Sequence, residues 1–177
     1  MILTISGKAG SGKSTIAKDL AKKLKIRHYS IGDLMRQLAQ EKKVSLLELS
    51  KLAEEDESID RELDQKQIEL RKQDNFVIDG RLTAFFIPNA TLKVFLDCDN
   101  IIRAKRIIKE KRHDEQHETV QQALKRIKMR EDSERKRYKQ YYDVDYYDPR
   151  LYDMVIDTSN LRVDQVLGKI MDRIKKG

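Results

Sequence analysis

The sequence predicts an α/β protein built on one doubly wound parallel sheet of about five strands. Short apolar runs alternate along the chain with amphipathic helical stretches, and several runs are apolar at consecutive positions, as strands buried on both faces require. The 177 residues include two prolines and seven glycines, and no linker-like segment divides them. A chain of this length fits one core, so we expect residues 1–177 to form a single domain.

The first half of the chain begins with a β-rich run, Ile2–Ser6, that a glycine-rich turn follows. The next segment, Lys13–Leu24, has apolar residues at the spacing of one helix face. The same patterns predict the elements up to the middle of the chain, which are a strand at Arg27–Ser30, helices at Asp33–Glu41, Leu46–Glu55 and Ile59–Arg71, and a strand at Phe76–Asp79.

The second half contains a strand at Lys93–Asp97 and then a long helical region, Asn100–Tyr141, with a weaker and highly charged stretch near residues 110–119. A last strand, Met154–Asp157, precedes a closing helix at Val163–Ile174. The charged run Lys109–His117 has two interpretations of equal weight, a flap that moves over a site or a solvated connection between helices.

Composition narrows the class of protein. Lysine and arginine number 37 against 30 acidic residues, a net charge of +7 that favours anionic partners such as nucleotides, nucleic acid or membrane surfaces. Cys98 is the one cysteine, which excludes an internal disulfide and a cysteine-based zinc cluster and favours a reducing compartment. No apolar run approaches the roughly 18 residues that cross a bilayer, and Met1 leads directly into the first strand. We expect a cytoplasmic, monomeric protein.

The segment Gly7–Ser14 matches the pattern G-x-x-x-x-G-K-[ST] in full and lies between a predicted strand and a predicted helix. Glycines let the backbone turn and bring its N–H groups against phosphate oxygens, where the helix N-terminus adds partial positive charge. Lys13 is expected to reach the β- and γ-phosphates of ATP, and the Ser14 hydroxyl to bind Mg²⁺. The predicted ATP-binding residues are Gly7, Lys8, Ala9, Gly10, Ser11, Gly12, Lys13, Ser14 and Thr15.

Asp79 ends an apolar strand, as the aspartate of a Walker B motif does. It would bind Mg²⁺ through water or orient the acceptor of the phosphoryl group. The alternative is a simple turn aspartate before Gly80. Because ligands of parallel sheets collect at the carboxyl ends of strands, we favour the functional interpretation.

Acceptor-binding candidates also follow predicted strands. After the second strand come Ser30 and Asp33, either of which can cap a helix, and Arg36 on the same helix face as Asp33. After the third strand comes Arg81. Two arginines from separate loops can converge on a phosphate through bidentate hydrogen bonds, although ordinary surface ion pairing is the alternative for each.

Helical spacing also places Arg126, Arg130 and Arg137 on one stripe, with Glu134 beside them. Such crowding of like charges suits phosphoryl transfer, because arginines neutralise the charge spread over the transferring group. The alternative is a solvated helix stabilised by an Arg130–Glu134 pair.

Taken together, the chain resembles the nucleoside monophosphate kinases, most closely the short archaeal-type cytidylate kinases. The specific motifs are Ser30-x-Gly-Asp-Leu-x-Arg36, Asp79-Gly-Arg81, the segment Arg130–Tyr138 and the segment Tyr152–Ser159. The resemblance implies a P-loop fold in which ATP and CMP or dCMP react, with Mg²⁺, to give ADP and CDP or dCDP. It also implies a monophosphate-binding region at about residues 33–72 and a lid at about residues 107–138.

The resemblance also implies roles for individual residues. Arg36, Arg81 and Arg137 would hold the acceptor phosphate, while Arg130 and Glu134 would lie near the ribose and the transferring phosphoryl group. Lys13, Arg130 and Arg137 would be the catalytic residues. On the donor side, Arg103 and Arg106 would face ATP phosphates or adenine, and Thr158-Ser159-Asn160 would border the adenine.

Two positions depart from the longer bacterial-type relatives: Leu82 stands where they carry an aspartate that helps to read cytosine, and Met35 replaces an expected aromatic residue. Arg61 and Asp64, one helical turn apart, offer instead a donor and an acceptor for the cytosine edge. We therefore predict that these two residues read the base.

Two alternatives stay open. One is a kinase for another small acceptor, such as AMP, UMP or shikimate; the other is an ATP-binding, RNA-associated factor, which the basic charge alone suggests. The sequence has no N-K-x-D motif of the kind that reads guanine. We expect no stable nucleic-acid partner, and we expect the late tyrosines to pack the lid helix onto the sheet; they are Tyr138, Tyr141, Tyr142, Tyr146, Tyr147 and Tyr152.

Overall fold

A computed structural model describes residues 1–109 and 119–176. Its centre is a five-stranded, fully parallel sheet with the strand order β2-β3-β1-β4-β5. The strands are β1 (Ile2–Gly7), β2 (Arg27–Ser30), β3 (Phe76–Gly80), β4 (Leu92–Asp97) and β5 (Met154–Asp157). The predicted class, a doubly wound parallel sheet, is therefore confirmed.

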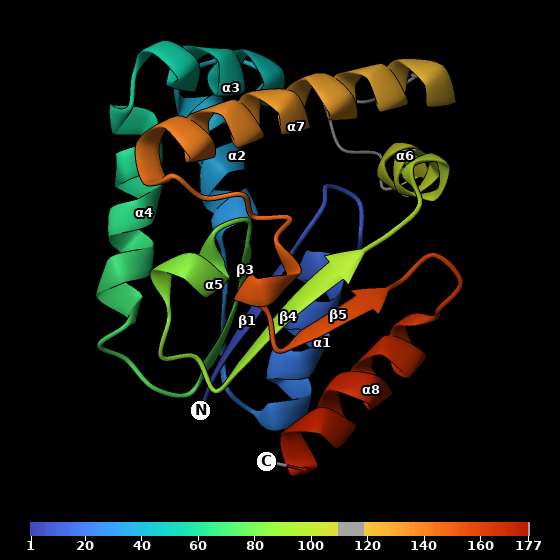
Figure 1. Ribbon diagram of the computed structural model, residues 1–177. Helices are drawn as coiled ribbons and strands as arrows, with labels where there is room; N and C mark the ends of the chain where they lie inside the picture. The colour runs from blue at the N-terminus through green and yellow to red at the C-terminus, as the bar shows by residue number, and fades with distance from the viewer. Residues whose placement is uncertain (110–118, 177) are drawn as a thin grey trace.

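Helices surround the sheet in two groups (Figure 1). Helices α1 and α8 cover one face, whereas α2, α3 and α7 gather beyond the carboxyl ends of the strands. Helix α7 packs against both α3 and α6. The helices are α1 (Lys13–Leu24), α2 (Ile31–Glu41), α3 (Leu46–Glu55), α4 (Ser58–Leu70), α5 (Thr83–Phe86), α6 (Asn100–Lys109), α7 (Val120–Tyr142) and α8 (Val163–Lys175), with a 3₁₀ turn, η2, at Pro149–Leu151.

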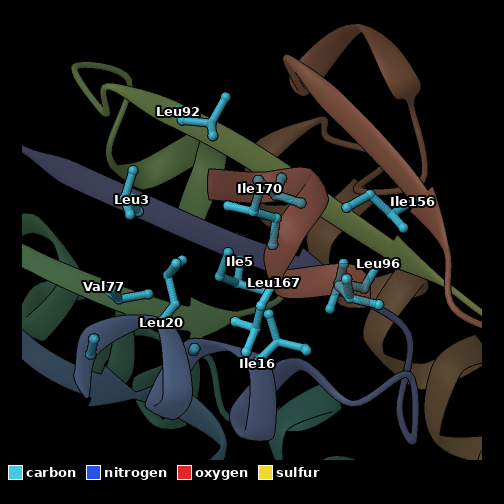
Figure 2. Close-up of a cluster of buried hydrophobic side chains, with 14 residues drawn as sticks. Leu3, Ile5, Ile16, Leu20, Val77, Leu92, Leu96, Ile156, Leu167 and Ile170 are labelled. Atoms are coloured by element: carbon cyan, nitrogen blue, oxygen red, sulfur yellow. The ribbon is translucent and has the colours of Figure 1, made fainter. Parts of the chain in front are cut away.

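The principal apolar core lies between the sheet and the pair α1 and α8 (Figure 2). Leu3 and Ile5 of β1 contact it from the centre of the sheet, and Ile16 and Leu20 of α1 meet Ile170 of α8 there. All five side chains are buried. This core fixes the position of β1, and so of the loop that follows it.

The opposite face of the sheet carries a second core rich in aromatic residues. Tyr146 is fully buried beside Phe95 of β4, and Tyr138 brings the carboxyl-terminal part of α7 into the same cluster. Tyr147 and Tyr152 also contact the Phe95 ring. The tyrosines therefore do pack α7 onto the sheet, as predicted.

Tyr141 is the one of these tyrosines that does not join the cluster around Phe95; it donates to the carbonyl oxygen of Ala53 in α3. The described parts of the predicted long helical region form α6 and α7, and the charged run Lys109–His117 lies, apart from Lys109, outside the described residues. Helix α5 and η2 were not predicted, because four- and three-residue elements are too short to show a period.

Within the described part of the chain, no helix is both long and apolar enough to cross a membrane.

Candidate active site

The phosphate-binding loop joins the end of β1 to the start of α1. Gly7 lies so close to β4 that an added Cβ would be 2.2 Å from the carbonyl oxygen of Leu96. Gly12 has a φ of 90°, a left-handed conformation that favours glycine, and it caps the N-terminus of α1. The loop therefore needs glycine at both ends, and it directs the first amide groups of α1 outward.

Lys13, the first residue of α1, lies over this loop. Its Nζ donates to the carbonyl oxygen of Lys8 at 2.7 Å, and the residue is buried. Burial, together with the positive charge of Arg81, holds the pKa of Lys13 well below its usual value. A buried ammonium of this kind gains strongly from an anion placed beside it.

Asp79 joins the loop to β2. Its carboxylate accepts from Ser14 Oγ at 2.8 Å and from Ser30 Oγ at 3.3 Å, and its other oxygen lies 2.7 Å from His28 Nε2. The register that pairs Ser30 with Asp79 brings these groups together at the carboxyl ends of neighbouring strands. Ser30 also caps α2 by accepting from the backbone N–H of Asp33.

The Ser14 and Asp79 pair fits Mg²⁺ in its chemistry. A hydroxyl and a carboxylate supply the oxygen ligands that Mg²⁺ prefers, and Mg²⁺ at nucleotide sites takes its remaining ligands from phosphates and water. Among the described residues, no cluster of three or more His, Cys, Asp or Glu side chains suited to a metal is found.

Glu134 of α7 holds two arginines together. It accepts from Arg81 Nε at 2.8 Å and from Arg130 Nε at 3.0 Å, and its side chain is almost fully buried. Burial acts to raise the pKa of this carboxyl, but the charges of Arg81 and Arg130 outweigh it and bring the pKa to about 2. Because Arg81 also donates to the Gly7 carbonyl oxygen, the cluster is anchored to the phosphate-binding loop.

One cavity connects these groups, and we call it the loop cavity. Its lining includes Lys13 and Ser14 of the phosphate-binding loop and the three arginines Arg36, Arg81 and Arg130. The far wall comes from α4 and α7, namely from Asp60, Leu63, Asp64, Gln67 and Tyr138. Met35 and Leu82, the two positions that depart from bacterial-type relatives, also line the cavity. Positive side chains thus lie between a phosphate-binding loop and a partly apolar wall.

Four predicted substrate residues are not among those that line the loop cavity, namely Ser30, Asp33, Arg61 and Arg137. Arg137 is 1 % exposed and donates to Asp60 at 2.7 Å and to the Ser50 carbonyl oxygen at 2.8 Å. It shares a helix stripe with Arg130 but lies two turns further along, about 10 Å away. Arg61 faces solvent and pairs with Glu57 of its own helix. The prediction that Arg61 faces the acceptor base is therefore not met by this geometry, because its exposed side chain pairs with Glu57 and does not line the loop cavity.

Asp33 lies beside the site and contacts one of its arginines. Its carboxylate pairs with Arg36, but it is largely exposed and does not line the loop cavity. It therefore orients Arg36, whose guanidinium does line the cavity. Arg126 of the predicted stripe lies on α7 and is not among the lining residues.

The predicted donor-side residues lie on the other side of the phosphate-binding loop. Arg103 is buried and donates to the Ala9 carbonyl oxygen at 3.1 Å, which supports the loop from behind. Arg106 donates to the backbone oxygen of Thr158 at 2.7 Å, and both residues line a shallow cavity beside Ser11 and Thr15. Ser159 and Asn160 follow Thr158 but do not line that cavity.

Burial raises the pKa of both aspartates of the far wall, Asp60 and Asp64. Burial raises the pKa of Asp64 to about 7, against a hydrogen bond from Tyr142 that lowers it, and the charge of Asp60 adds to the rise. Arg137, on the other side of Asp60, acts in the opposite direction. The folded protein therefore binds this proton more tightly than the unfolded chain, whose aspartates have pKa values near 4.

This rise predicts the effect of an Asp64→Asn substitution. Between about pH 4 and pH 7, Asp64 is ionised in the unfolded chain but still protonated in the folded protein. The free energy of unfolding of the wild type therefore falls as the pH rises through this range, by at most about 4 kcal/mol. Urea unfolding of both proteins at several pH values should show Asp64→Asn gaining relative stability across this range. Asp74→Asn, at an exposed site, is the control. A stability difference between wild type and Asp64→Asn that does not depend on pH would contradict the assignment.

Sequence reasoning missed three groups at this site. His28 was detectable, because side chains alternate along a strand and His28 therefore lies on the same side of β2 as Ser30. Gln67 follows Asp64 by one helical turn, a spacing that also predicts a shared face. Asp60 gave no signal, since its contact with Arg137 joins positions 77 residues apart in sequence.

The fold and the site together define a P-loop phosphotransferase: a parallel sheet, a phosphate-binding loop after β1, and converging arginines at the carboxyl ends of the strands. A family model described as "Cytidylate kinase-like family" matches residues 2–160. The chain belongs to this cytidylate kinase-like family.

Curated relatives agree with this assignment. A protein of Pyrococcus abyssi named Cytidylate kinase is 41% identical over 159 residues, which cover 90% of this chain and 85% of the relative. A protein of Methanocaldococcus jannaschii with the same name is 39% identical over 183 residues, 99% of this chain and 100% of the relative.

Solved structures agree on the fold alone. An uncharacterized protein from Eubacterium ventriosum has a TM-score of 0.74 at 21% identity, with 100% of this chain and 99% of that chain covered. Shikimate kinase from Bacteroides thetaiotaomicron has a TM-score of 0.64 at 16% identity, with coverage of 99% and 98%.

Proposed function

We propose that this protein transfers the γ-phosphoryl group of ATP to CMP or dCMP, giving ADP and CDP or dCDP. The observation that carries the proposal is the loop cavity, in which Lys13 and Ser14 face Arg36, Arg81 and Arg130 across one continuous space. Membership of the cytidylate kinase-like family and relatives named Cytidylate kinase support a cytosine nucleotide as the acceptor.

On the donor side, the amide groups of Gly7–Ser14 and the start of α1 bind the ATP phosphates, and Lys13 reaches the β- and γ-phosphates. Arg106 and Thr158 border the space beyond the loop, where the adenine would lie. Arg103 supports the loop through the Ala9 carbonyl and is therefore a positioning residue.

On the acceptor side, Arg36, Arg81 and Arg130 bind the monophosphate. Guanidinium groups bind phosphate oxygens in a bidentate manner, so three of them restrict its orientation. Glu134 holds Arg81 and Arg130 at a fixed separation before substrate arrives, which lowers the entropy cost of aligning the attacking oxygen. Arg137 stabilises the wall behind them through Asp60.

Ser14 and Asp79 would hold Mg²⁺ through their oxygens. The chemistry that the ion would supply there is neutralisation of phosphate charge during transfer. His28 and Ser30 hold the Asp79 carboxylate in place.

The reaction needs no covalent intermediate on the protein. Lys13, Arg81 and Arg130 stabilise the charge of the transferring phosphoryl group, while a monophosphate oxygen attacks in line. We further propose that residues 1–177 act as one domain, with a monophosphate-binding region at about residues 33–72 and a lid at about residues 107–138 that excludes water. We place the protein in the cytoplasm as a monomer without a stable nucleic-acid partner.

The test is a panel of acceptors at fixed ATP and Mg²⁺. CMP and dCMP should be phosphorylated with a kcat/KM at least about 10-fold above that for UMP, AMP or shikimate, because polar side chains that bind one base leave unpaired groups against another. A reaction without acceptor measures ATP hydrolysis and should be slower than transfer. Shikimate or AMP as the best acceptor would overturn the proposal in favour of another small-molecule kinase. ATP-dependent RNA binding with a steep salt dependence and no transfer would favour an RNA-associated factor.

A further inference from the structure

Gln67 occupies an unusual position in the far wall of the loop cavity. It lies on α4, is 2 % exposed and lines the cavity. Its Nε2 donates to Asp64 Oδ1 at 3.2 Å, whereas its Oε1 has no hydrogen-bond partner among the described residues. A buried amide oxygen without a partner costs about 1–3 kcal/mol, so this one is expected to be satisfied by a bound molecule.

The contact with Asp64 sets the orientation of the Gln67 amide. An ionised carboxylate only accepts hydrogen bonds, so the Gln67 amide must direct its nitrogen to Asp64. Tyr142 donates to the other Asp64 oxygen and fixes that carboxylate from behind. The amide therefore cannot rotate by half a turn without placing two acceptors against each other. The amide atom left without a partner among the described residues is therefore the acceptor oxygen, Oε1.

We propose that Gln67, oriented by Asp64, accepts a hydrogen bond from the exocyclic amino group of the acceptor base. The inference rests on the proposed function, since it concerns the base of the same monophosphate. Cytosine presents an amino donor at the position where uracil presents a carbonyl oxygen. A uracil placed in the same way would bring its carbonyl oxygen against Gln67 Oε1 and the Asp64 carboxylate, because the Gln67 amide nitrogen is turned towards Asp64.

An amino group on the base needs a hydrogen-bond acceptor, which Gln67 offers and Arg61, the base-reading residue expected from sequence, does not. Arg61 offers donors only and faces solvent. Asp64 keeps its expected place in the wall, but both of its carboxylate oxygens already accept hydrogen bonds from Tyr142 and Gln67. Asp64 therefore acts mainly through Gln67, as a positioning residue.

The test compares three variants at pH 8, where Asp64 is largely ionised. Gln67→Met keeps the volume of the side chain and removes the acceptor. The double variant Asp64→Asn with Gln67→Glu reverses the internal hydrogen bond, because the new amide at position 64 donates to one oxygen of the new carboxylate at position 67 and leaves the other oxygen facing the base. Gln65→Leu, on the exposed side of the same helix, is the matched control.

We expect Gln67→Met to lower the ratio of kcat/KM for CMP over UMP by about 10–100-fold. The double variant should keep most of the wild-type ratio, and Gln65→Leu all of it. Calorimetric titration of CMP without ATP should show the same order of affinities, and thermal unfolding reports whether each variant folds. A purely structural role for Gln67 would alter stability while leaving the CMP-to-UMP ratio unchanged.

The inference is overturned if folded Gln67→Met keeps the wild-type CMP-to-UMP ratio, or if the double variant loses it. In either case, CMP phosphorylation by the wild-type protein leaves the proposed function in place. If Gln67→Met does not fold, the double variant decides. Wild-type protein that phosphorylates no cytosine nucleotide overturns the proposed function, and the inference with it.

Discussion

Replacing Lys13 with alanine is expected to lower kcat for phosphoryl transfer by at least about 10³-fold, the effect found when a phosphate-neutralising group is removed from such sites. Lys13 is buried over the phosphate-binding loop, and only the Lys8 carbonyl oxygen accepts from its Nζ among the hydrogen bonds described. Its positive charge is therefore poorly compensated by the protein and well placed for the β- and γ-phosphates. A steady-state assay with CMP and ATP measures the loss.

The same substitution should not harm the fold. Burial already disfavours the Lys13 ammonium, so its removal should leave the melting temperature unchanged or raise it. Lys18→Ala, at an exposed position of the same helix, is the control and should retain wild-type kcat. Retained transfer in folded Lys13→Ala would exclude the loop as the donor site.

The Glu134→Gln substitution should produce the largest loss of stability. Its folded-state pKa of about 2 lies below the value near 4.3 of an unfolded glutamate, so Glu134 stabilises the fold when ionised. This contribution, about 3 kcal/mol, is fully present above about pH 5 and is lost as the pH falls towards 2. A neutral glutamine would leave Arg81 and Arg130 facing each other without compensation.

Urea unfolding at several pH values checks this result. Wild type should exceed Glu134→Gln in free energy of unfolding at pH 7, and the difference should shrink below pH 5. Asp132→Asn, at an exposed position of the same helix, should change stability by no more than about 0.5 kcal/mol. Because Glu134 also orients the acceptor arginines, the variant should raise the KM for CMP. A stability difference that persists undiminished as the pH falls to 2 would contradict the assigned charge pairing.

The donor half of the site was accessible to sequence reasoning because it is local. Eight consecutive residues, Gly7–Ser14, form the phosphate-binding loop, and their spacing carries the geometry. Asp79 was found for a similar reason, since an apolar strand that ends in a carboxylate must deliver it to the edge of the sheet where the loop lies. Its hydrogen bond with Ser14 agrees with that expectation.

The acceptor half was predicted less well. Helical spacing predicts which residues share a face of a helix, but it does not predict which part of that face lies at the cavity. Arg130 and Arg137 share a stripe, yet Arg130 lines the loop cavity and Arg137 is buried against Asp60. Likewise Arg61 and Asp64 are one turn apart, but the side of α4 that packs against the molecule includes Asp64 and leaves Arg61 in solvent.

The sequence by itself determined the fold class, the phosphate-binding loop and the family, because each depends on short-range patterns of apolar, glycine and charged residues. Only the tertiary structure decided which charged side chains pair with one another and which line the cavity. Asp60 neutralises Arg137 and Glu134 joins Arg81 to Arg130, whereas the oxygen of Gln67 is left without a partner among the described residues. Those pairings join α4, α7 and the loop after β3, and burial makes them strong by excluding the water that would otherwise screen each charge.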